Sequence, residues 1–283
     1  MNTSPDPAYE AEYNLRGRHK DADVFIGRWT SESERVRKVL KCKLDERVGP
    51  APKATLDVFP ASRPGSPIFV FIHGGYWRRM DKLDHSFVAE VPIAAGAAVA
   101  VINYDLCPGV TIDQIVAQCR DATAWVYRHA ADMNGDANRI FVSGHSAGGH
   151  LTATTIWHDW RADGLPADLV KGALPISGIF DLHPIRRTSI NDDVRLDQAA
   201  ADRLSPLFHR PRHMPPVIAA VGEGETYAFR EQNRLYAETW RLWGGEAEEL
   251  VLKGVHHFDV ILEFAHADSA LCKALFELMG LGR

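Results

Sequence analysis

Short runs of consecutive apolar residues alternate with longer amphipathic stretches through most of this sequence. The run 68–72, Ile-Phe-Val-Phe-Ile, contains no polar position, which is typical of a strand buried on both faces of a sheet. Further apolar runs predict strands at 97–103, 139–143, 172–177, 217–221 and 248–252. Stretches with helical periodicity separate them at 111–131, 147–160, 227–243 and 264–278. This alternation predicts an α/β fold, with a mostly parallel sheet and helices on both faces.

Two segments fall outside the alternation. Clusters of β-forming residues at 39–47 and 55–59 flank a turn rich in glycine and proline, which predicts an antiparallel hairpin at the start of the sheet. The polar residues 1–35 are expected to form an arm outside the sheet. The connection 181–215 is too long for a simple loop, so we expect short helices there that form a small cap together with the arm. The prediction is a single domain over residues 1–283.

The composition is that of an ordinary globular protein, with 46% hydrophobic and 24% charged residues. The net charge of −5 is spread along the chain without a basic tract, so nucleic acid is not expected as a partner. No apolar run approaches the roughly 20 residues of a membrane span, and the first residues lack the basic and apolar segments of a secretory signal. We therefore expect no membrane partner and a cytoplasmic location, with a homodimer left open.

Neither the cysteines nor the histidines show the spacing of a metal site. The four cysteines are far apart and are expected to be small buried apolar residues: Cys42, Cys107, Cys119 and Cys272. The thirteen histidines contain no pair with ligand spacing beyond chance. No metal and no cofactor are expected.

The pentapeptide Gly-His-Ser-Ala-Gly at 144–148 lies between a predicted strand and a predicted helix. A G-x-S-x-G sequence in this context is typical of a tight turn that exposes its serine at the carboxyl edge of a sheet. The small residues are needed because the backbone is strained and the helix packs closely. We predict Ser146 as a catalytic nucleophile, with His145 beside it lining the substrate pocket.

A second motif, His-Gly-Gly-Tyr-Trp at 73–77, directly follows the strand 68–72. Glycines at this point allow backbone N–H groups to approach a carbonyl oxygen without a Cβ in the way. We therefore predict an oxyanion hole, whose contributing residues are Gly74, Gly75, Tyr76 and Ala147.

A nucleophilic serine needs a general base, and the base needs an acid that orients it, in the chain order serine, acid, histidine. The strand 217–221 runs into Gly-Glu-Gly-Glu, which offers Glu225 as the preferred acid and Glu223 as the alternative. The last predicted strand is followed by two adjacent histidines, of which His257 is preferred over His256. Chain position alone leaves both choices open.

These motifs resemble the kynurenine formamidase-like branch of the α/β hydrolases, close to the hormone-sensitive-lipase type of esterase. The lipase type has His-Gly-Gly-Gly, whereas His-Gly-Gly-Tyr-Trp is similar to the formamidase form. Asn103-Tyr104 and the segment 177–182 match as well. The resemblance extends over nearly the whole chain and implies the α/β-hydrolase fold.

The resemblance also bears on the catalytic residues. The segment His257-Phe258 matches the family, which supports His257 as the base. The acid falls three residues after Gly222, at Glu225, where many relatives have aspartate. A glutamate is one carbon longer and can still orient an imidazole.

The expected activity is that of a cofactor-free serine hydrolase acting through an acyl-enzyme. The expected substrates are small carboxylic esters or N-formyl arylamides such as N-formylkynurenine, with Trp77, Tyr76 and Phe258 as an aromatic wall. One alternative is a short-chain carboxylesterase without formamidase activity. The other is a non-catalytic binding protein with a hydrolase fold, which the presence of a serine, an acid and a histidine in the required order argues against.

Overall fold

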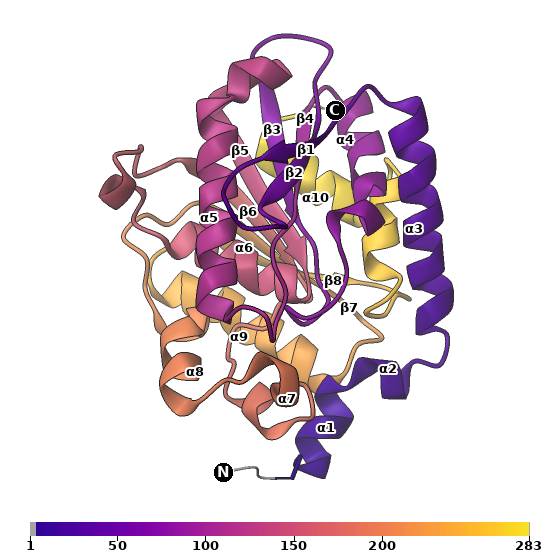
Figure 1. Ribbon diagram of the computed structural model, residues 1–283, viewed down its shortest axis with the longest axis vertical. Coiled ribbons are helices and arrows are strands. Elements are labelled where there is room, and N and C mark those ends of the chain that lie inside the picture. The colour runs from indigo at the N-terminus through magenta and orange to yellow at the C-terminus, as the bar shows by residue number, and fades with distance from the viewer. Residues whose placement is uncertain (1–3, 283) are drawn as a thin grey trace.

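The computed structural model describes residues 4–282. Their strands form one eight-stranded sheet (Figure 1). The strands, in their spatial order, are β1 (Lys43–Arg47), β2 (Thr55–Phe59), β4 (Ala98–Ile102), β3 (Ser66–Ile72), β5 (Gly135–His145), β6 (Val170–Ile176), β7 (Val217–Gly222) and β8 (Ala247–Leu252). The pairs β1–β2 and β2–β4 are antiparallel, and all other neighbours are parallel. The predicted α/β fold with an antiparallel N-terminal pair is confirmed.

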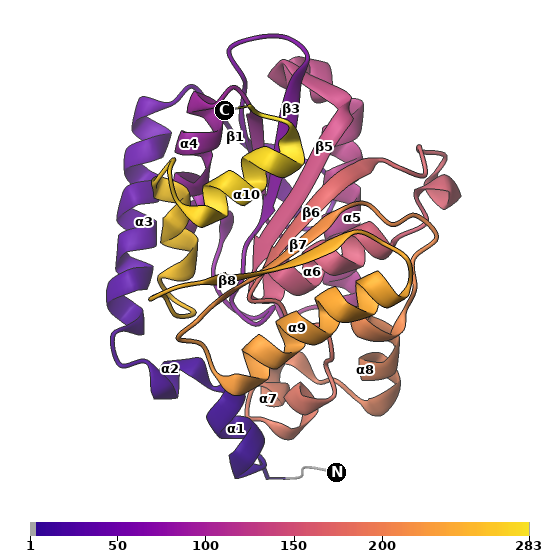
Figure 2. The same cartoon turned by 180° about the vertical axis from the view of Figure 1, so that it is seen from behind.

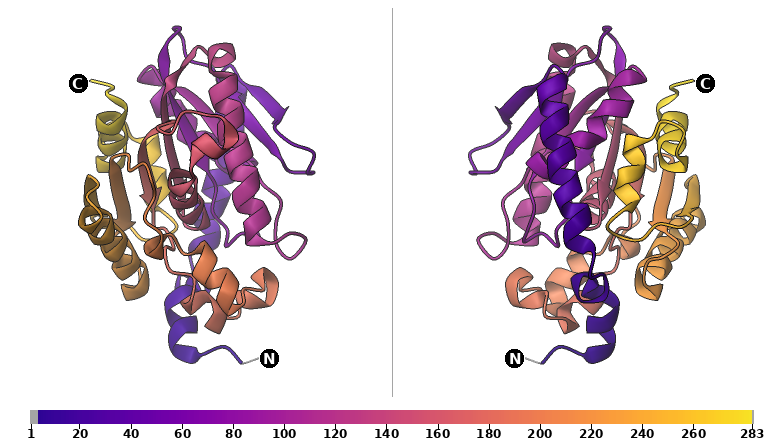
Figure 3. Two further views of the ribbon diagram at one scale, coloured as in Figure 1. Left: turned by 90° about the vertical axis from the view of Figure 1, so that its left-hand side faces the viewer. Right: turned by 90° about the vertical axis from the view of Figure 1, so that its right-hand side faces the viewer.

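Helices cover both faces of this sheet, as the edge views in Figure 3 show. The α-helices are α1 (Pro7–Tyr13), α2 (Leu15–Arg18), α3 (Ala22–Val39), α4 (Glu90–Ala94), α5 (Ile112–Arg128), α6 (Ala147–Trp157), α7 (Asn191–Val194), α8 (Gln198–Leu204), α9 (Tyr227–Leu242) and α10 (Ala270–Met279). Short 3₁₀ helices lie at η1 (Lys82–Asp84), η2 (Ser86–Ala89), η3 (Ala130–Met133), η4 (Trp160–Asp163), η5 (Pro184–Arg187), η6 (Pro206–Phe208) and η7 (Val260–Ala265). The helices α5 and α6 lie on one face, and α4 and α10 lie on the other (Figures 1 and 2).

The central strands form where the sequence is continuously apolar. Every residue of β3 and β4 is buried, as expected for parallel strands covered on both sides. The helices begin at polar caps: Thr111 and Gln114 form a capping box at the start of α5, and the Thr226 hydroxyl caps α9. The register pairs Ile72 of β3 with Gly144 of β5, so the two glycine motifs meet at one edge of the sheet.

The N-terminal arm lies against the long connection between β6 and β7. In Figures 1 and 2, α1 and α2 gather with α7 and α8 at one end of the molecule. The backbone N–H of Asp6 donates to the carbonyl of Arg187 at 2.8 Å, and the N–H of Ser189 donates to Glu10 Oε2 at 2.8 Å. The connection contains the short helices that its length predicts. Residues 1–3 of the expected arm lie outside the described residues.

Two of the predicted boundaries that differ from the structure have a clear physical reason. Helix α3 extends from the arm to Val39, so the first strand begins at Lys43 and not at residue 39. The reason is a buried stripe on α3, formed by Trp29, Ser33 and Val36 at helical spacing, which packs against the core. The expected helix 264–278 is split, because the Ser269 hydroxyl accepts the N–H of Cys272 and starts a new helix there.

Three of the cysteines, Cys107, Cys119 and Cys272, are buried as predicted, whereas Cys42 is only half-buried. Burial raises the pKa of the Cys107 thiol to about 11. Within residues 4–282, no helix has both the length and the apolar character that crossing a membrane requires. The cytoplasmic location stays a prediction.

Buried histidines make the stability of the fold depend on pH. Burial lowers the pKa of His73 to about 3 and that of His150 to about 4. His150 accepts a hydrogen bond from Trp77 Nε1 on Nδ1, and its Nε2 donates to the carbonyl of Leu204 at 2.8 Å, so the neutral ring is fully used. Their contribution to stability is complete above the unfolded pKa near 6.5 and is lost as the pH falls toward these lowered values.

We therefore expect His73 and His150 each to lower the free energy of unfolding by about 2 kcal/mol between pH 7 and pH 5. Urea unfolding at the two pH values measures this difference. Replacing His150 with glutamine should remove the part of this pH dependence that His150 contributes. Replacing the exposed His266 with glutamine is the matched control. An unfolding free energy that is the same at both pH values would contradict the prediction.

Candidate active site

Ser146 lies at the turn between β5 and α6, where the backbone is strained. Its φ of 59° and ψ of −119° place a non-glycine residue at a positive φ, and it is the N-terminal cap of α6. A Cβ at Gly144 would lie 2.4 Å from the carbonyl oxygen of Gly148, and one at Gly148 would lie 2.0 Å from the carbonyl oxygen of Ile72. Both glycines of the motif are therefore required by the close packing of α6 on the sheet.

The glycine loop after β3 lies directly against this turn. A Cβ at Gly74 would lie 2.7 Å from the carbonyl oxygen of His145 and 3.1 Å from the Cβ of Ser146. Gly75 has a φ of 106°, and a Cβ there would lie 2.2 Å from the carbonyl oxygen of Arg79. Two residues with side chains, Tyr76 and Trp77, follow at positive φ, so the loop holds a tight and strained turn beside the serine.

Two buried side chains hold the carbonyl of Gly74. His73 Nδ1 donates to it at 2.8 Å, and the Tyr104 hydroxyl, whose shorter bond of 2.8 Å goes to the carbonyl of His73, lies 3.2 Å from it. The two rings stack with their centroids 4.1 Å apart. The N–H of Gly75 belongs to the same peptide plane and points in the opposite direction from this carbonyl. Anchoring the carbonyl thus fixes the direction of the Gly75 N–H, one of the predicted oxyanion donors.

Glu225 and His257 form a buried hydrogen-bonded pair. Glu225 Oε2 lies 2.7 Å from His257 Nδ1, and both residues are 3% exposed. The other oxygen, Oε1, accepts the N–H of Gly222 at 2.9 Å and the hydroxyl of Ser177. A carboxylate that accepts three hydrogen bonds is held in one orientation. It orients the imidazole with the proton on Nδ1, which leaves the Nε2 lone pair free to accept a proton.

The two sequence alternatives lie elsewhere. Glu223 is exposed, and its Oε2 accepts the N–H of Gly254 at 3.2 Å. His256 accepts the N–H of Phe258 on Nδ1 at 3.0 Å, and its Nε2 lies 3.6 Å from Asp21 Oδ2. Neither residue lines the cavity that holds Ser146.

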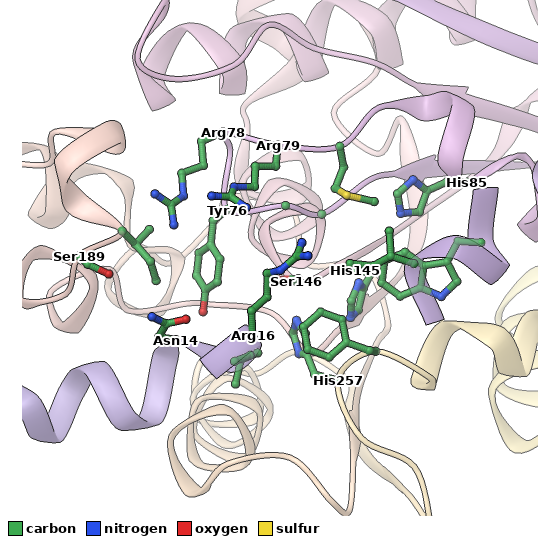
Figure 4. A pocket seen from close by; sticks show the side chains of 18 residues that line it. Asn14, Arg16, Tyr76, Arg78, Arg79, His85, His145, Ser146, Ser189 and His257 are labelled. Carbon is green, nitrogen blue, oxygen red and sulfur yellow. The ribbon is translucent and has the colours of Figure 1, made fainter. Parts of the chain in front are cut away.

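Ser146 and His257 line a cavity of about 420 Å³ (Figure 4). The predicted site residues that also line this cavity are Gly74, Gly75, Tyr76, His145 and Phe258. Ala147 is buried at the first position of α6, directly behind the serine. Within residues 4–282, no side chain or backbone group forms a hydrogen bond with Ser146 Oγ.

Trp77 does not contact this cavity, so its expected place in the substrate wall is wrong. The strained loop turns the side chain inward, where it is fully buried. Its Nε1 donates to His150 Nδ1 at 3.2 Å, so Trp77 packs the loop against α6. The sequence alone does not separate an aromatic residue that lines a pocket from one that packs beneath it.

Sequence reasoning missed several cavity residues that come from the arm. The arm contributes Asn14, Leu15, Arg16, Ile26 and Trp29. The spacing of Ile26 and Trp29 was a signal of one helical face, but nothing local indicated which surface that face would cover. Ser177, the donor to Glu225, was also missed as a functional residue, although it opens the segment 177–182 that matches the family.

His145 lies beside His257, the predicted base. Its ring centroid is 4.5 Å from that of His257, and burial holds the pKa of His145 well below its usual range. The nearby His257 lowers this pKa further, because two charged imidazoles would repel each other. His145 is therefore a neutral neighbour of His257.

His19, Asp21 and His256 are close enough in space to hold a metal ion, with their ligand atoms within 4.8 Å of one another. The hydrogen bond from Phe258 N–H to His256 Nδ1 places the proton of the neutral ring on Nε2, the atom that faces Asp21. A nitrogen that carries a proton offers no lone pair to a metal. The chemistry of the donor set does not fit a metal ion in this arrangement, and the group lies outside the Ser146 cavity.

The acid assignment predicts different effects for the two glutamates. Glu225→Gln keeps the shape of the side chain but removes its charge. It also allows an amide N–H to face His257 Nδ1, which would then have to accept instead of donate, so kcat is expected to fall by about 10²-fold or more. Glu223→Gln, on an exposed position of the same loop, is the control and should change kcat little. Steady-state kinetics of both variants on one ester measure this. A large loss at Glu223 with near-normal activity at Glu225 would reverse the assignment.

A family model described as the alpha/beta hydrolase fold matches residues 69–260, so the chain belongs to this family and is a serine hydrolase. Among curated proteins it is similar to a kynurenine formamidase from Danio rerio, with 29% identity over 258 residues that cover 88% of this chain and 86% of the relative. Among solved structures it is similar to a candidate thioesterase from Silicibacter sp., with 31% identity, a TM-score of 0.83 and coverage of 92% of this chain and 96% of that chain. An esterase from Pyrobaculum calidifontis has the same fold, with 21% identity, a TM-score of 0.74 and coverage of 92% and 93%.

Proposed function

We propose that this hydrolase cleaves small carboxylic esters and N-formyl arylamides, with Ser146 as nucleophile, His257 as base and Glu225 as orienting acid. The observation that carries the proposal is the buried hydrogen bond of 2.7 Å between His257 Nδ1 and Glu225 Oε2. His257 lines the same cavity as Ser146. A neutral imidazole held by a buried carboxylate is suited to accept the serine proton.

The reaction has two balanced halves. In the first, Ser146 Oγ bonds to the substrate carbonyl carbon while its proton passes to His257 Nε2, and the oxyanion accepts hydrogen bonds from N–H groups of the loop at Gly75 and from Ala147. The bond to the leaving group then breaks, and the leaving oxygen or nitrogen takes the proton from His257. In the second half, water attacks the acyl-enzyme, gives a proton to His257, and restores the Ser146 hydroxyl as the acid is released.

The choice of substrates is supported by the cavity and by the relatives. Trp29 and Phe258 line one wall with their rings 6.3 Å apart and nearly parallel, which suits an aryl group. The relative from Danio rerio is a kynurenine formamidase. Both features favour an N-formyl arylamide such as N-formylkynurenine, or an aryl ester, as the substrate.

The test compares hydrolysis of N-formylkynurenine with that of p-nitrophenyl acetate and butyrate. We expect turnover of the formamide with a kcat/KM at least equal to that for the esters. Turnover of the esters alone would identify a short-chain carboxylesterase without formamidase activity, which is the second candidate. That candidate is supported by the similarity to a candidate thioesterase, because a thioester and an ester present the same carbonyl chemistry.

A fluorophosphonate probe separates both enzymatic functions from the non-catalytic alternative. The probe should label the native protein at Ser146, because it reacts with an activated serine. A folded protein that is not labelled would support a binding role and contradict the proposal.

A further inference from the structure

One wall of the cavity carries positive charge. The lining includes the guanidinium groups of Arg16, Arg78 and Arg79, which stay charged at any physiological pH. None of the described residues that line the cavity is an aspartate or a glutamate. Figure 4 shows Arg78 and Arg79 next to each other beyond the Tyr76 ring. The chain as a whole has a net charge of −5, so the positive charge of the cavity lining is opposite in sign to the net charge of the protein.

The three arginines differ in how far nearby acids neutralise them. Arg16 forms an ion pair with Asp23, and Arg78 forms one with Asp193. Arg79 is exposed and, within residues 4–282, forms neither an ion pair nor a side-chain hydrogen bond. Among the residues that the structure describes, Arg79 therefore contributes the one arginine charge in this cavity that no carboxylate compensates.

The backbone holds Arg79 close to the reacting groups. Its N–H donates to the carbonyl of Gly75 at 3.0 Å, and Met80 follows at a positive φ of 73°. The arginine thus belongs to the same tight turn that presents the oxyanion donors. The aromatic wall formed by Trp29 and Phe258 belongs to other elements, so the cavity combines an apolar surface with a cationic one.

We infer that the cavity selects substrates that carry a carboxylate in addition to the bond that is cleaved, and that Arg79 binds this carboxylate. A guanidinium group matches a carboxylate through two parallel N–H···O bonds, which gives direction as well as charge. An aryl group against Trp29 and Phe258 would leave the carboxylate free to face the arginines. This inference rests on the proposed hydrolysis of esters and arylamides by Ser146.

The test uses three aryl acetates of nearly equal size and different charge. These are 3-acetoxybenzoate, its neutral methyl ester, and the cationic 3-acetoxy-N,N,N-trimethylanilinium. All three transfer an acetyl group to the enzyme and release a phenol. For the wild-type protein at low ionic strength, we expect kcat/KM to be highest for the anion and lowest for the cation, by about tenfold for each step in charge. Added salt should reduce the differences.

Arg79→Gln should reduce the ratio of kcat/KM for the anion to that for the cation by about tenfold, mainly through KM for the anion. Arg79→Lys keeps the charge but not the paired N–H groups, and should retain an intermediate preference. Arg63→Gln, at an exposed arginine in the turn before β3, is the matched control and should leave the ratio at its wild-type value. A purely structural role of Arg79 would lower all three rates together and leave the ratio unchanged.

Equal kcat/KM for the three esters in the wild type, or an unchanged ratio in Arg79→Gln, would overturn the inference while the hydrolase function stands. Failure to hydrolyse even the neutral ester would instead overturn the proposed function, and the inference with it. A preference for the anion that persists in Arg79→Gln but disappears in Arg78→Gln would show that Arg79 is the wrong residue.

Discussion

Replacing Ser146 with alanine is expected to lower kcat by roughly 10⁴-fold or more on any ester that the wild type hydrolyses. The expected fall in kcat follows because the substitution removes the oxygen that attacks the carbonyl, and only that oxygen. The strained turn, with φ of 59°, is held by the packing of α6 on the sheet, and the N–H of Ser146 still donates to the carbonyl of Ile176 at 2.8 Å. Initial rates with p-nitrophenyl butyrate, corrected for spontaneous hydrolysis, measure the effect.

The fold should survive this substitution, so an unchanged circular dichroism spectrum and unfolding midpoint are the controls for it. The fluorophosphonate probe should no longer label the variant. A variant that keeps more than a few per cent of the wild-type rate would show that the nucleophile is another residue.

Replacing His257 with alanine is expected to reduce kcat about as much as the loss of Ser146, because the nucleophile and its base act as a unit. The buried ring of His257 is the proposed acceptor of the serine proton, and Glu225 does not replace it because its Oε1 remains held by the Gly222 N–H and the Ser177 hydroxyl. The rate of covalent labelling by the probe should fall together with kcat, since both require an activated serine.

His256→Ala is the matched control for this prediction, because the neighbouring histidine lies outside the cavity. It should keep most of the wild-type kcat. Inactivity of His256→Ala with activity in His257→Ala would exchange the roles of the two residues. Because the loss of either ring can weaken the fold, unfolding midpoints of both variants accompany the kinetics.

The sequence by itself predicted the parts of this protein that depend on local pattern. The run 68–72 contains no polar residue, and such a segment is stable only inside a sheet that is covered on both faces. The glycines at 74 and 144 precede turns that leave no space for a Cβ, so their spacing after strands indicated where the chain bends and which serine it exposes. Parallel strands bring their carboxyl ends to one edge of the sheet, so the sequence order alone indicates that both motifs lie near each other.

Only the tertiary structure decided which side chains meet across that edge. Glu225 and Glu223 are two positions apart and chemically identical, and the path of the loop alone brings one to His257 and leaves the other in solvent. Trp77 looked like a pocket residue, but the turn directs it into the core.

The cavity wall contributed by the arm depended on contacts between segments about 180 residues apart, such as that between Glu10 and Ser189. Local periodicity specifies that a helix has an apolar face but not the surface that this face covers, because that depends on the shape of the rest of the fold. For the same reason, the cationic wall at Arg16, Arg78 and Arg79 became visible only when the arm and the glycine loop lay together in space.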